Sequence, residues 1–355
     1  MKTARLIVCL LLWPLTMWYA IIVAIRNWMY DCGLKRSARP AIPTIGIGNL
    51  RMGGTGKTPH TEYLIRRFAD RHVALLSRGY GRTTQGFLLA NGESTAAQIG
   101  DEPSMMARKF PTLTVAVCED RNEGVRRLAQ MPLPPSLVLL DDVYQHRSTH
   151  PDVQILLTEY GDPYFNDRIL PFGNLRELRS GSRRADIIVV TKCPPMLSLA
   201  KRTQYQRRLK LHDNQQLFFS QIDYQPPVPL YDGSPWQPVK EVLLVTGIAH
   251  PAPLKHHLEK QCTVVAMPFP DHHTFTQSDC QHIRKAFSSM EEKSKVIVTT
   301  EKDAMRLLNP DCRSALQDLP IFFIPIAVSI IDSDRFDETL RSLINGSAAS
   351  RQASY

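Results

Sequence analysis

Short apolar runs alternate with amphipathic stretches along most of the chain. A short apolar run is typical of a buried strand, whereas apolar residues spaced three and four apart indicate one face of a helix. Before residue 226 the pattern predicts strands at 44–48, 73–77, 113–117, 137–140, 155–158 and 187–191, and helices at 57–69, 101–109 and 120–129. This alternation favours an α/β fold with a mostly parallel sheet flanked by helices.

A proline-rich stretch at residues 226–238 interrupts this alternation. Clustered prolines are typical of a connection between folded regions. After it, the pattern predicts strands at 242–246, 263–266, 296–300 and 321–324, and helices at 254–260, 280–290 and 336–344. The predicted organisation is therefore an N-terminal helix at 1–30, a core at 31–225, a second and smaller α/β domain at 226–345, and a polar tail at 346–355.

The N-terminal segment contains 20 consecutive residues without a charge, from 6 to 25. As a helix this run would be about 30 Å long, the thickness of a hydrocarbon core. It is longer than the apolar part of a signal peptide, and no small-residue cleavage site follows it. The segment therefore predicts a membrane-associated helix. Pro14 and Thr16 interrupt the run, so both a spanning and an interfacial orientation stay open.

The charge indicates which partners the protein could bind, and the cysteine content indicates its cellular compartment. Lys and Arg outnumber Asp and Glu by 43 to 34, which suits anionic lipids, phosphorylated substrates or nucleic acid. No zinc-finger or RNA-binding motif accompanies the basic charge, so we expect no nucleic-acid partner. The seven cysteines include no C-x-x-C pair and are odd in number. This favours reduced thiols in the cytoplasm over a disulfide framework, and the basic residues after the apolar run also favour a cytoplasmic core.

The clearest chemical motif is G-N-L-R-M-G-G-T-G-K-T at residues 48–58, between a predicted strand and a predicted helix. In that context it predicts a P-loop, whose backbone N–H groups cradle phosphates. Lys57 should neutralise the β- and γ-phosphates, and the Thr58 hydroxyl should bind Mg²⁺. One position departs from the standard pattern, because Arg51 stands where a glycine is usual. The predicted nucleotide-binding residues are Gly53, Gly54, Thr55, Gly56, Lys57 and Thr58.

Three acidic sites follow predicted strands or begin a predicted helix. Asp141 and Asp142 end the strand at 137–140, the arrangement that holds Mg²⁺ in P-loop enzymes. Asp101 and Glu102 precede Pro103 at a helix start, where the sequence alone allows either helix capping or a catalytic base with a metal ligand. The third site, D-H-H at 271–273, could orient a base or be solvated, and both interpretations stay open.

These residues belong to a series of motifs that resembles the tetraacyldisaccharide 4'-kinase family of lipid A biosynthesis. The resemblance extends from the apolar N-terminus to about residue 308. Its motifs are the P-loop with the following proline (48–59), S-R-G-Y-G-R (77–82), G-D-E-P (100–103), E-D-R (119–121), D-D-V-Y-Q-H-R (141–147), L-P-F-G-N-L-R-E (170–177), F-P-D-H-H-T-F (269–275) and T-E-K-D-A (300–304). Each motif is short, but their number and order make the match specific.

The resemblance implies a P-loop kinase that moves the γ-phosphate of ATP, with Mg²⁺, to the 4'-hydroxyl of a tetraacyldisaccharide 1-phosphate. It implies that Asp101 is the base, paired with His272, and that Glu102, Asp141 and Asp142 serve the metal. The implied location is the cytoplasmic face of the inner membrane of a Gram-negative bacterium, without an obligate protein partner. The residues implied to bind the sugar phosphate are Arg78, Arg121, His146, Arg176 and Glu177.

Two positions depart from the family pattern beside the acidic pair: Val143 replaces a usual glycine and Tyr144 a usual phenylalanine. Val143 introduces a β-branched residue next to Asp141 and Asp142, which would alter the backbone geometry at the acidic pair. The main alternative is a P-loop GTPase or ATPase switch at a membrane surface, since T-K-C-P at 191–194 resembles the start of a guanine-binding motif. Pro194 occupies the place of the aspartate that would bind guanine, which disfavours this alternative.

Overall fold

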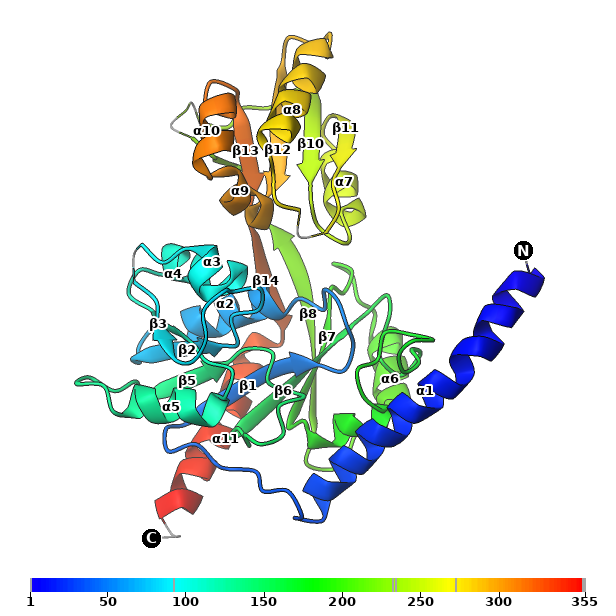
Figure 1. The fold of residues 1–355 in the computed structure, drawn as a ribbon, viewed down its shortest axis with the longest axis vertical. Helices are drawn as coiled ribbons and strands as arrows, with labels where there is room; N and C mark the ends of the chain where they lie inside the picture. Colours follow the sequence, from blue (N-terminus) through cyan, green and yellow to red (C-terminus); the bar gives the residue numbers. More distant parts are fainter. Residues whose placement is uncertain (1, 92, 232, 234, 272, 353–355) are drawn as a thin grey trace. The chain divides into compact units, whose positions relative to one another are not determined.

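The computed structural model describes residues 2–91, 93–231, 233, 235–271 and 273–352, with side chains of the terminal helices only for residues 13–31 and 333–347. The chain forms two compact units. Unit 1 comprises residues 1–222 and 328–355, and unit 2 comprises residues 223–327. Each unit has its own sheet, and we describe each by itself (Figure 1).

Unit 1 is built on a nine-stranded sheet in the order β14-β8-β7-β6-β1-β5-β2-β4-β3. The strands from β8 to β4 pair in parallel, and β3 adds an antiparallel edge. Apolar side chains of the central strands are fully buried, as expected where helices cover a parallel sheet. The strands are β1 (Thr44–Asn49), β2 (Val73–Ser77), β3 (Leu88–Leu89), β4 (Thr114–Val117), β5 (Leu137–Leu140), β6 (Val153–Glu159), β7 (Ile187–Thr191), β8 (Gln216–Tyr224) and β14 (Ile326–Ile331).

Several helices of unit 1 directly follow parallel strands of this sheet, so the N-terminal ends of these helices lie beside the strands' carboxyl ends. That edge is where ligands bind in parallel α/β sheets. It carries the P-loop after β1 and the two aspartates after β5. The helical elements are α1 (Lys2–Asp31), α2 (Lys57–Arg67), α3 (Ala96–Ile99), α4 (Asp101–Lys109), α5 (Arg121–Ala129), the 3₁₀ segment η1 (Arg179–Arg184), α6 (Leu199–Leu209) and α11 (Ser333–Gln352).

Two glycines of β1 make room for the segment that follows the aspartates. A Cβ atom on Gly46 would lie 2.7 Å from Cγ1 of Val143, and one on Gly48 would lie 2.6 Å from Cβ of Tyr144. Such distances are too short for carbon atoms, so only glycine permits this close approach. Val143 is buried and its N–H donates to the carbonyl of Ile47 (3.2 Å). The β-branched residue is thus accommodated by β1 next to the aspartates.

Unit 2 has a five-stranded sheet in the order β11-β10-β12-β13-β9, parallel except for β9 at one edge. Separate apolar clusters cover its two faces. A second, smaller α/β unit therefore exists. Its elements are β9 (Val228–Pro229), β10 (Glu241–Thr246), α7 (Ala252–Leu258), β11 (Thr263–Pro268), α8 (Gln277–Ser289), β12 (Lys295–Thr300), α9 (Glu301–Leu307), α10 (Pro310–Leu316) and β13 (Ile321–Ile324).

The end of the chain differs from the prediction. Residues 328–345 were predicted in the second domain but belong to unit 1, and α11 continues through the predicted tail to Gln352. The reason is aromatic packing. The ring of Phe336 meets the edges of Phe218 (5.0 Å between ring centres) and Tyr63 (5.9 Å), which fixes α11 on the first sheet.

Helix α1 carries Pro14 within it and extends from the side of unit 1 (Figure 1). Its two faces differ. Thr16 and Val23 are buried against the unit, whereas the large apolar side chains of the outer face are exposed. More than half of the surface is exposed for Trp13, Leu15, Trp18, Ile22, Ile25 and Trp28. Within the residues that the structure describes, no helix has the length and apolar character needed to cross a membrane.

Candidate active site

The glycine-rich turn between β1 and α2 is shaped to bind an anion. Gly53 and Gly56 have φ angles of 98° and 88°, in the left-handed region that favours glycine. Within the described part of the chain, the N–H groups of Gly54, Gly56 and Lys57 have no backbone acceptor. Free amides at the N-terminal end of a helix form a phosphate site. All six predicted nucleotide-binding residues, 53–58, lie in this turn or in the first turn of α2.

Thr55 anchors the turn to the sheet. Its hydroxyl accepts a hydrogen bond from Nδ2 of Asn49 on β1 (2.7 Å), and its carbonyl accepts one from Oγ1 of Thr191 at the end of β7 (2.9 Å). All three residues are buried. The turn is therefore attached by hydrogen bonds to two strands of the sheet, β1 and β7, before any ligand binds.

Asp142 lies between two cationic side chains. Its carboxylate accepts hydrogen bonds from both terminal nitrogens of Arg176 (2.9 and 3.2 Å), and Nζ of Lys57 lies 3.6 Å from Oδ1. Burial by itself would raise the pKa of Asp142, but Lys57 and Arg176 outweigh it and hold the pKa at about 2. Asp142 is thus ionised and orients two cations at the edge of the P-loop.

Asp141 has the opposite environment. Burial, followed by the nearby carboxylates of Glu102 and Asp142, raises the pKa of Asp141 to about 7. Its Oδ1 atom is buried and has no hydrogen-bond partner among the described residues. Glu102 accepts a hydrogen bond from the Thr58 hydroxyl (3.0 Å). Thr58, Glu102 and Asp141 also line one small cavity of about 10 Å³, the room of a single water molecule.

These three residues fit Mg²⁺. A buried, unpartnered carboxylate oxygen beside a second carboxylate and a hydroxyl is an arrangement that a cation would stabilise. No group of three or more His, Cys, Asp or Glu side chains in the described part of the chain is placed to hold a metal by itself. This agrees with Mg²⁺ chemistry, in which one or two carboxylates act together with substrate phosphates and water.

Asp101 and Glu102 occupy the first turn of α4, whose N-cap is Gly100 with a φ of 93°. Asp101 is exposed, and Glu102 is half-buried against Thr58. No side-chain cap hydrogen bond is formed at this helix start. The cap position therefore belongs to Gly100, and both carboxylates lie in the first turn beyond it, with Glu102 in contact with Thr58 of α2.

Two of the predicted sugar-phosphate residues follow neighbouring strands. Arg121 is 2% exposed, and its guanidinium donates to the carbonyls of Cys118 (3.1 Å) and Asp141 (3.3 Å). Burial lowers the pKa of Arg121, and the charges of Asp141 and Asp142 oppose that shift. Arg78, directly after β2, is exposed. Arg121 thus hydrogen-bonds to the backbone of the acidic pair, whereas Arg78 is exposed to solvent.

His146 lies in the segment after the aspartates and is half-buried. Its Nδ1 atom is 3.2 Å from the Ser148 hydroxyl. Burial lowers the pKa of His146, and the positive charges of Arg121 and Arg78 add to that effect. The ring is therefore neutral near pH 7, close to a group of arginines.

Arg51, the departure from the standard P-loop, has a structural role. Its guanidinium donates to the Asp162 carbonyl (2.6 Å) and pairs with the Asp162 carboxylate (2.6 Å) and, at 3.6 Å, with that of Asp167. Its backbone forms a β-bridge with Leu175. The side chain therefore ties the P-loop to the segment before Arg176, where a glycine could not.

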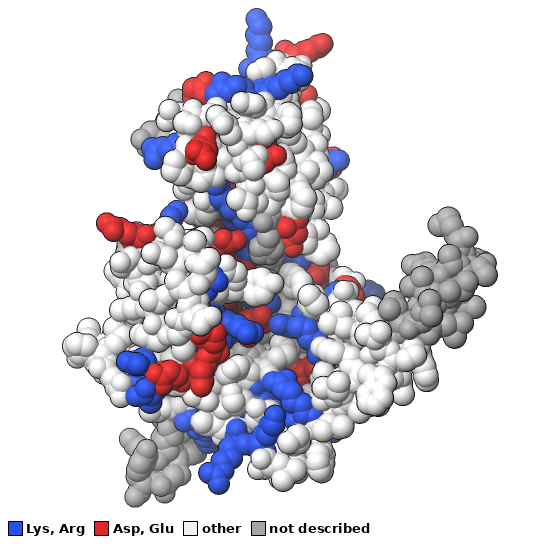
Figure 2. Space-filling view, in the orientation of Figure 1, with Lys and Arg blue, Asp and Glu red and all other residues white. Residues whose placement is uncertain are grey.

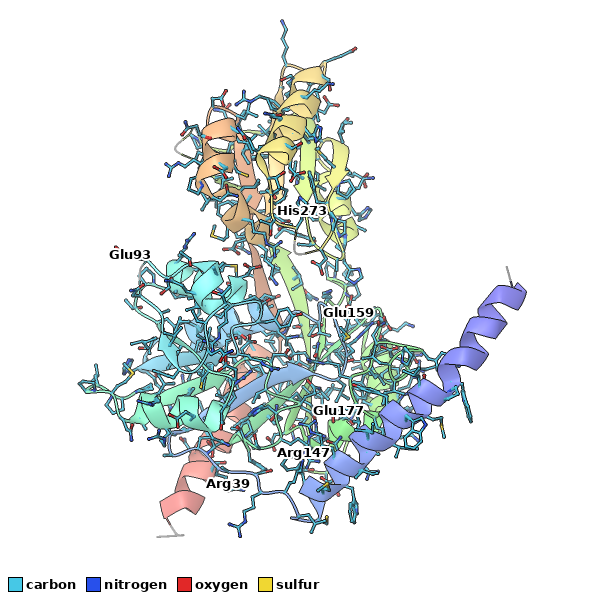
Figure 3. The ribbon with its side chains drawn as sticks, viewed as in Figure 1. Arg39, Glu93, Arg147, Glu159, Glu177 and His273 are labelled. Carbon is cyan, nitrogen blue, oxygen red and sulfur yellow. The ribbon has the colours of Figure 1, made fainter. Side chains whose placement is uncertain are left out.

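Glu177 connects this segment to α1. Its carboxylate accepts hydrogen bonds from Asn27 of α1 (3.1 Å), Gln145 (3.0 Å) and Arg184 (2.9 Å), and Figure 3 shows Glu177 beside α1. The Tyr19 hydroxyl of α1 donates to the Arg176 carbonyl (2.8 Å). Glu177 is 2% exposed. The buried Glu177 carboxylate therefore links α1, the segment after the aspartates and η1 through hydrogen bonds.

The sequence did not predict these contacts of α1. Tyr19 lies inside the uncharged run and Arg26 and Asn27 directly follow it. In the structure Tyr19 and Asn27 hydrogen-bond to the site and Arg26 donates to the Gln145 carbonyl (2.7 Å). Only the position of Gln145 inside the D-D-V-Y-Q-H-R motif pointed to that residue. Basic side chains also gather over the segment that joins α1 to β1 (Figure 2), where Lys35, Arg36 and Arg39 are exposed.

In unit 2 the predicted His272 lies outside the described residues. Its neighbour His273, labelled in Figure 3, is 3.0 Å from the Asp279 carboxylate through Nε2. In the T-E-K-D-A motif, Asp303 is fully buried and accepts hydrogen bonds from the Gly247 N–H (2.9 Å) and the Thr300 hydroxyl (2.8 Å). This motif thus closes the turn after β10.

Comparison with known proteins decides the family. The family model described as tetraacyldisaccharide-1-P 4'-kinase matches residues 8–345. This chain belongs to that family. The resemblance predicted from the motifs is confirmed, and with it the prediction of a kinase of lipid A biosynthesis.

Curated proteins named tetraacyldisaccharide 4'-kinase are similar to this chain over most of their length. The protein of that name from Parabacteroides distasonis is 46% identical over 308 residues, covering 84% of each chain. The one from Bacteroides thetaiotaomicron is 42% identical over 345 residues, covering 92% of this chain and 91% of the relative. These relatives are bacterial.

A solved structure of the family supports the fold. The "apo" form of LpxK from Aquifex aeolicus in complex with ATP is 27% identical, with a TM-score of 0.72, and the match covers 94% of this chain and 98% of that one. The predicted α/β class with largely parallel sheets is therefore confirmed.

Proposed function

We propose that this kinase uses ATP and Mg²⁺ to phosphorylate the 4'-hydroxyl of a tetraacyldisaccharide 1-phosphate at the cytoplasmic face of the inner membrane of a Gram-negative bacterium. The observation that carries the proposal is the meeting of the P-loop with Thr58, Glu102 and Asp141 at one edge of the sheet. The family and the ATP complex of the Aquifex aeolicus relative support the choice of acceptor and nucleotide.

In this proposal the P-loop amides and Lys57 hold the β- and γ-phosphates of ATP. Thr58, Glu102 and Asp141 hold Mg²⁺, which when bound supplies positive charge to the phosphate oxygens. Asp142, the fourth predicted metal ligand, directs its carboxylate to Lys57 and Arg176. We assign it the role of orienting these two cations, so that charge neutralisation is in place before the transfer begins.

The transfer itself needs an oriented hydroxyl and a proton acceptor. As the 4'-oxygen forms its bond to the γ-phosphorus, the bond from that phosphorus to the β–γ bridging oxygen breaks, and ADP leaves. The proton of the hydroxyl passes to the Asp101 carboxylate, which we propose as the base, oriented by His272. In this proposal the sugar phosphate is bound by Arg78, His146 and Arg176. The buried Arg121 and Glu177 support the surrounding segments through hydrogen bonds to the Asp141 carbonyl and from Gln145, respectively.

The activity is tested with detergent-solubilised protein, γ-labelled ATP, Mg²⁺ and a tetraacyldisaccharide 1-phosphate. We expect a labelled bis-phosphorylated lipid from the wild type and loss of about a thousandfold or more in Lys57→Ala, since Lys57 neutralises charge that is transferred. Hydrolysis of ATP or GTP without labelled lipid would reject the kinase reaction and favour a nucleotide switch.

The role of Asp101 has its own test. Asp101→Asn keeps the shape of the side chain but cannot accept the proton, so kcat should fall by about a hundredfold to ten-thousandfold while ATP affinity stays within about twofold. Measuring the acceptor kinetics together with ATP binding separates these effects. A near-normal kcat with weakened ATP binding would assign Asp101 to the nucleotide instead.

The membrane proposal rests on α1. Its outer face exposes a continuous set of Trp, Leu and Ile side chains, while its inner face hydrogen-bonds to the active site. A helix with these two faces is suited to lie in the interface with its apolar side in lipid. The acceptor is held in the same surface by its acyl chains, so docking raises its effective concentration.

A matched pair of variants tests the lipid contact. Replacing Trp18 and Ile22, which are exposed, with serine should release the protein from lipid vesicles and leave the site intact. Replacing Thr16 and Val23, which face unit 1, should affect stability more than vesicle binding. Equal sedimentation of the first variant and the wild type with vesicles would show that another surface binds lipid.

A further inference from the structure

His60 lies in the second position after Thr58 on α2 and is 5% exposed. Its Nδ1 atom is 2.6 Å from the Gly56 carbonyl oxygen, and its Nε2 atom is 2.9 Å from Oγ of Ser220 on β8. A carbonyl oxygen only accepts hydrogen bonds, so Nδ1 carries the proton. The neutral ring then accepts at Nε2 from the Ser220 hydroxyl.

Both ends of this link are fixed. Ser220 is fully buried on β8, and its carbonyl accepts from the Cys193 N–H (2.9 Å). Gly56 adopts a φ of 88° and precedes the first residue of α2. The His60 side chain therefore connects a buried strand to a glycine, the residue type with the greatest intrinsic backbone freedom.

The hydrogen bond to Gly56 fixes the direction of an amide. In a trans peptide the carbonyl and the next residue's N–H lie in the same plane and point in opposite directions. The ring of His60 holds the Gly56 carbonyl toward the protein interior, so the Lys57 N–H is directed away from it, toward the open side of the turn. Thr191 acts in the same way on the preceding plane, because its hydroxyl holds the Thr55 carbonyl and thereby directs the Gly56 N–H.

We propose that His60 is a positioning residue that sets the Gly56–Lys57 peptide plane of the P-loop and so prepares the Lys57 amide for the phosphates of ATP. This inference rests on the proposed binding of ATP. Helix geometry alone gives a weaker restraint, since the His60 N–H donates to the same carbonyl at 3.2 Å. The shorter contact from the ring supplies the additional restraint on a glycine that has no side chain of its own.

Three substitutions separate this role from mere packing. In His60→Asn, the amide nitrogen takes the place of Nδ1 and can still donate to Gly56. In His60→Gln, the amide is placed near the Nε2 position and can reach Ser220 but not Gly56 in the same way. His60→Leu fills the space without a donor. The proteins are compared in detergent as full chains, with circular dichroism and melting temperature as checks on folding.

The readouts are the affinities for ATP and for inorganic pyrophosphate, both with Mg²⁺, and the kinetics with the acceptor lipid. We expect His60→Leu and His60→Gln to bind both ligands about tenfold more weakly than the wild type, and His60→Asn to stay within about threefold. The KM for ATP should rise with little change in kcat, because the amide contacts phosphate before and during the transfer. The KM for the lipid should not change.

Two outcomes would overturn the proposal: folded His60→Leu that binds ATP within about twofold of the wild type, or His60→Asn that binds no better than His60→Gln. The second comparison remains decisive if His60→Leu does not fold, because both amide variants are polar and similar in size. Wild-type protein that fails to bind ATP would instead reject the proposed function, which distinguishes the two failures.

Discussion

The turn that follows β1 in unit 1 and the turn that follows β10 in unit 2 each join a buried parallel strand to a helix. In unit 1 the amides of Gly54, Gly56 and Lys57 have no backbone acceptor among the described residues. In unit 2 the corresponding amide, that of Gly247, donates to the buried carboxylate of Asp303 (2.9 Å). One turn is open to an external anion, and the other already binds an anion of its own chain.

The difference in amide availability shows that a strand–turn–helix arrangement does not by itself form a phosphate-binding site. Whether the turn can bind phosphate depends on whether a side chain of the protein already accepts hydrogen bonds from the turn's N–H groups. In unit 1, side chains hold the carbonyls of the turn, through His60 and Thr191, and leave the amides available. In unit 2, a side chain holds the amide itself. We therefore expect changes in the first turn to affect phosphate binding and changes in the second to affect folding.

The largest expected effect is on the folding of unit 2. Asp303→Asn removes the buried charge that faces Arg306 (3.0 Å) and Gly247, so the free energy of unfolding should fall by about 3–5 kcal/mol. ATP affinity should stay within about threefold of the wild type. Urea unfolding together with ATP titration measures both. A strong loss of ATP affinity in a folded variant would contradict the conclusion that the turn after β10 affects folding alone, because it would give this turn a role in nucleotide binding.

The next effect concerns the buried imidazole beneath the P-loop and its dependence on pH. Burial lowers the pKa of His60 from 6.5 to about 4. The unfolded chain therefore binds more protons than the native protein between these values, and stability should fall as the pH is lowered from 6.5 to 4, by up to about 3 kcal/mol. Stability is fully retained above pH 6.5.

Asp141 gives a slope of the opposite sign over much of this range, because burial and Glu102 raise its pKa to about 7. The comparison must therefore be between the wild type and His60→Asn, in which Asp141 is unchanged. Unfolding free energies at pH 7, 6 and 5 should show the wild type losing stability relative to the variant as the pH falls. Parallel curves for the two proteins would mean that His60 does not titrate in this way.

A matched pair of glycine substitutions tests the two turns directly. Gly56→Ala places a Cβ on a residue with a φ of 88°, which strains the open turn, and kcat/KM for ATP should fall by about a hundredfold. Gly247→Ala places a Cβ 3.1 Å from the Asp303 carboxylate, so it should lower the melting temperature and leave ATP binding near normal. The reverse pattern would contradict our assignment of the two turns.

The smallest effect is expected at Arg51, whose side chain contacts the segment 162–167. The partner Asp162 is half exposed, so Arg51→Ala should cost about 1 kcal/mol of stability and raise the KM for the acceptor a few-fold through Arg176. Asp162→Ala is the matched control and should have a smaller effect, because Arg51 keeps its contacts to the Asp162 carbonyl and to Asp167, and the double variant should be no worse than Arg51→Ala. Additive losses would show that the two residues act independently.

Much of the fold followed from the apolar pattern, because buried parallel strands are continuous apolar runs. The strands at 73–77, 137–140 and 187–191 have the predicted bounds. The pattern did not predict β8, whose sequence mixes polar and apolar residues. It also did not predict β14, an apolar run at the edge of the sheet that is only partly buried. It also could not show that α11 returns to the first sheet, because that depends on contacts between Phe336 and distant aromatic residues.

The candidate site likewise has features that local sequence predicts and features that depend on residues distant in the sequence. The P-loop residues and the aspartates after β5 could be predicted, since their chemistry depends on local spacing at strand ends. The different charges of Asp141 and Asp142 could not, because they come from Glu102, Lys57 and Arg176, which are far apart in the sequence. The departure at Arg51 was visible, but its reason required Asp162 and Asp167. His60 gave no signal at all, since its partner lies 160 residues away.

The contacts of α1 limit how this protein can be altered over evolutionary time. An anchor that only held the enzyme at a membrane could be exchanged for any apolar helix. Here Tyr19 and Asn27 bind the same segment that carries Arg176 and Glu177. A chimera with the N-terminal helix of a distant relative would therefore place unmatched side chains beside the segment that carries Arg176 and Glu177. We expect these helix residues to change together with Glu177 among relatives, while the outward-facing Trp and Ile residues drift freely among apolar types.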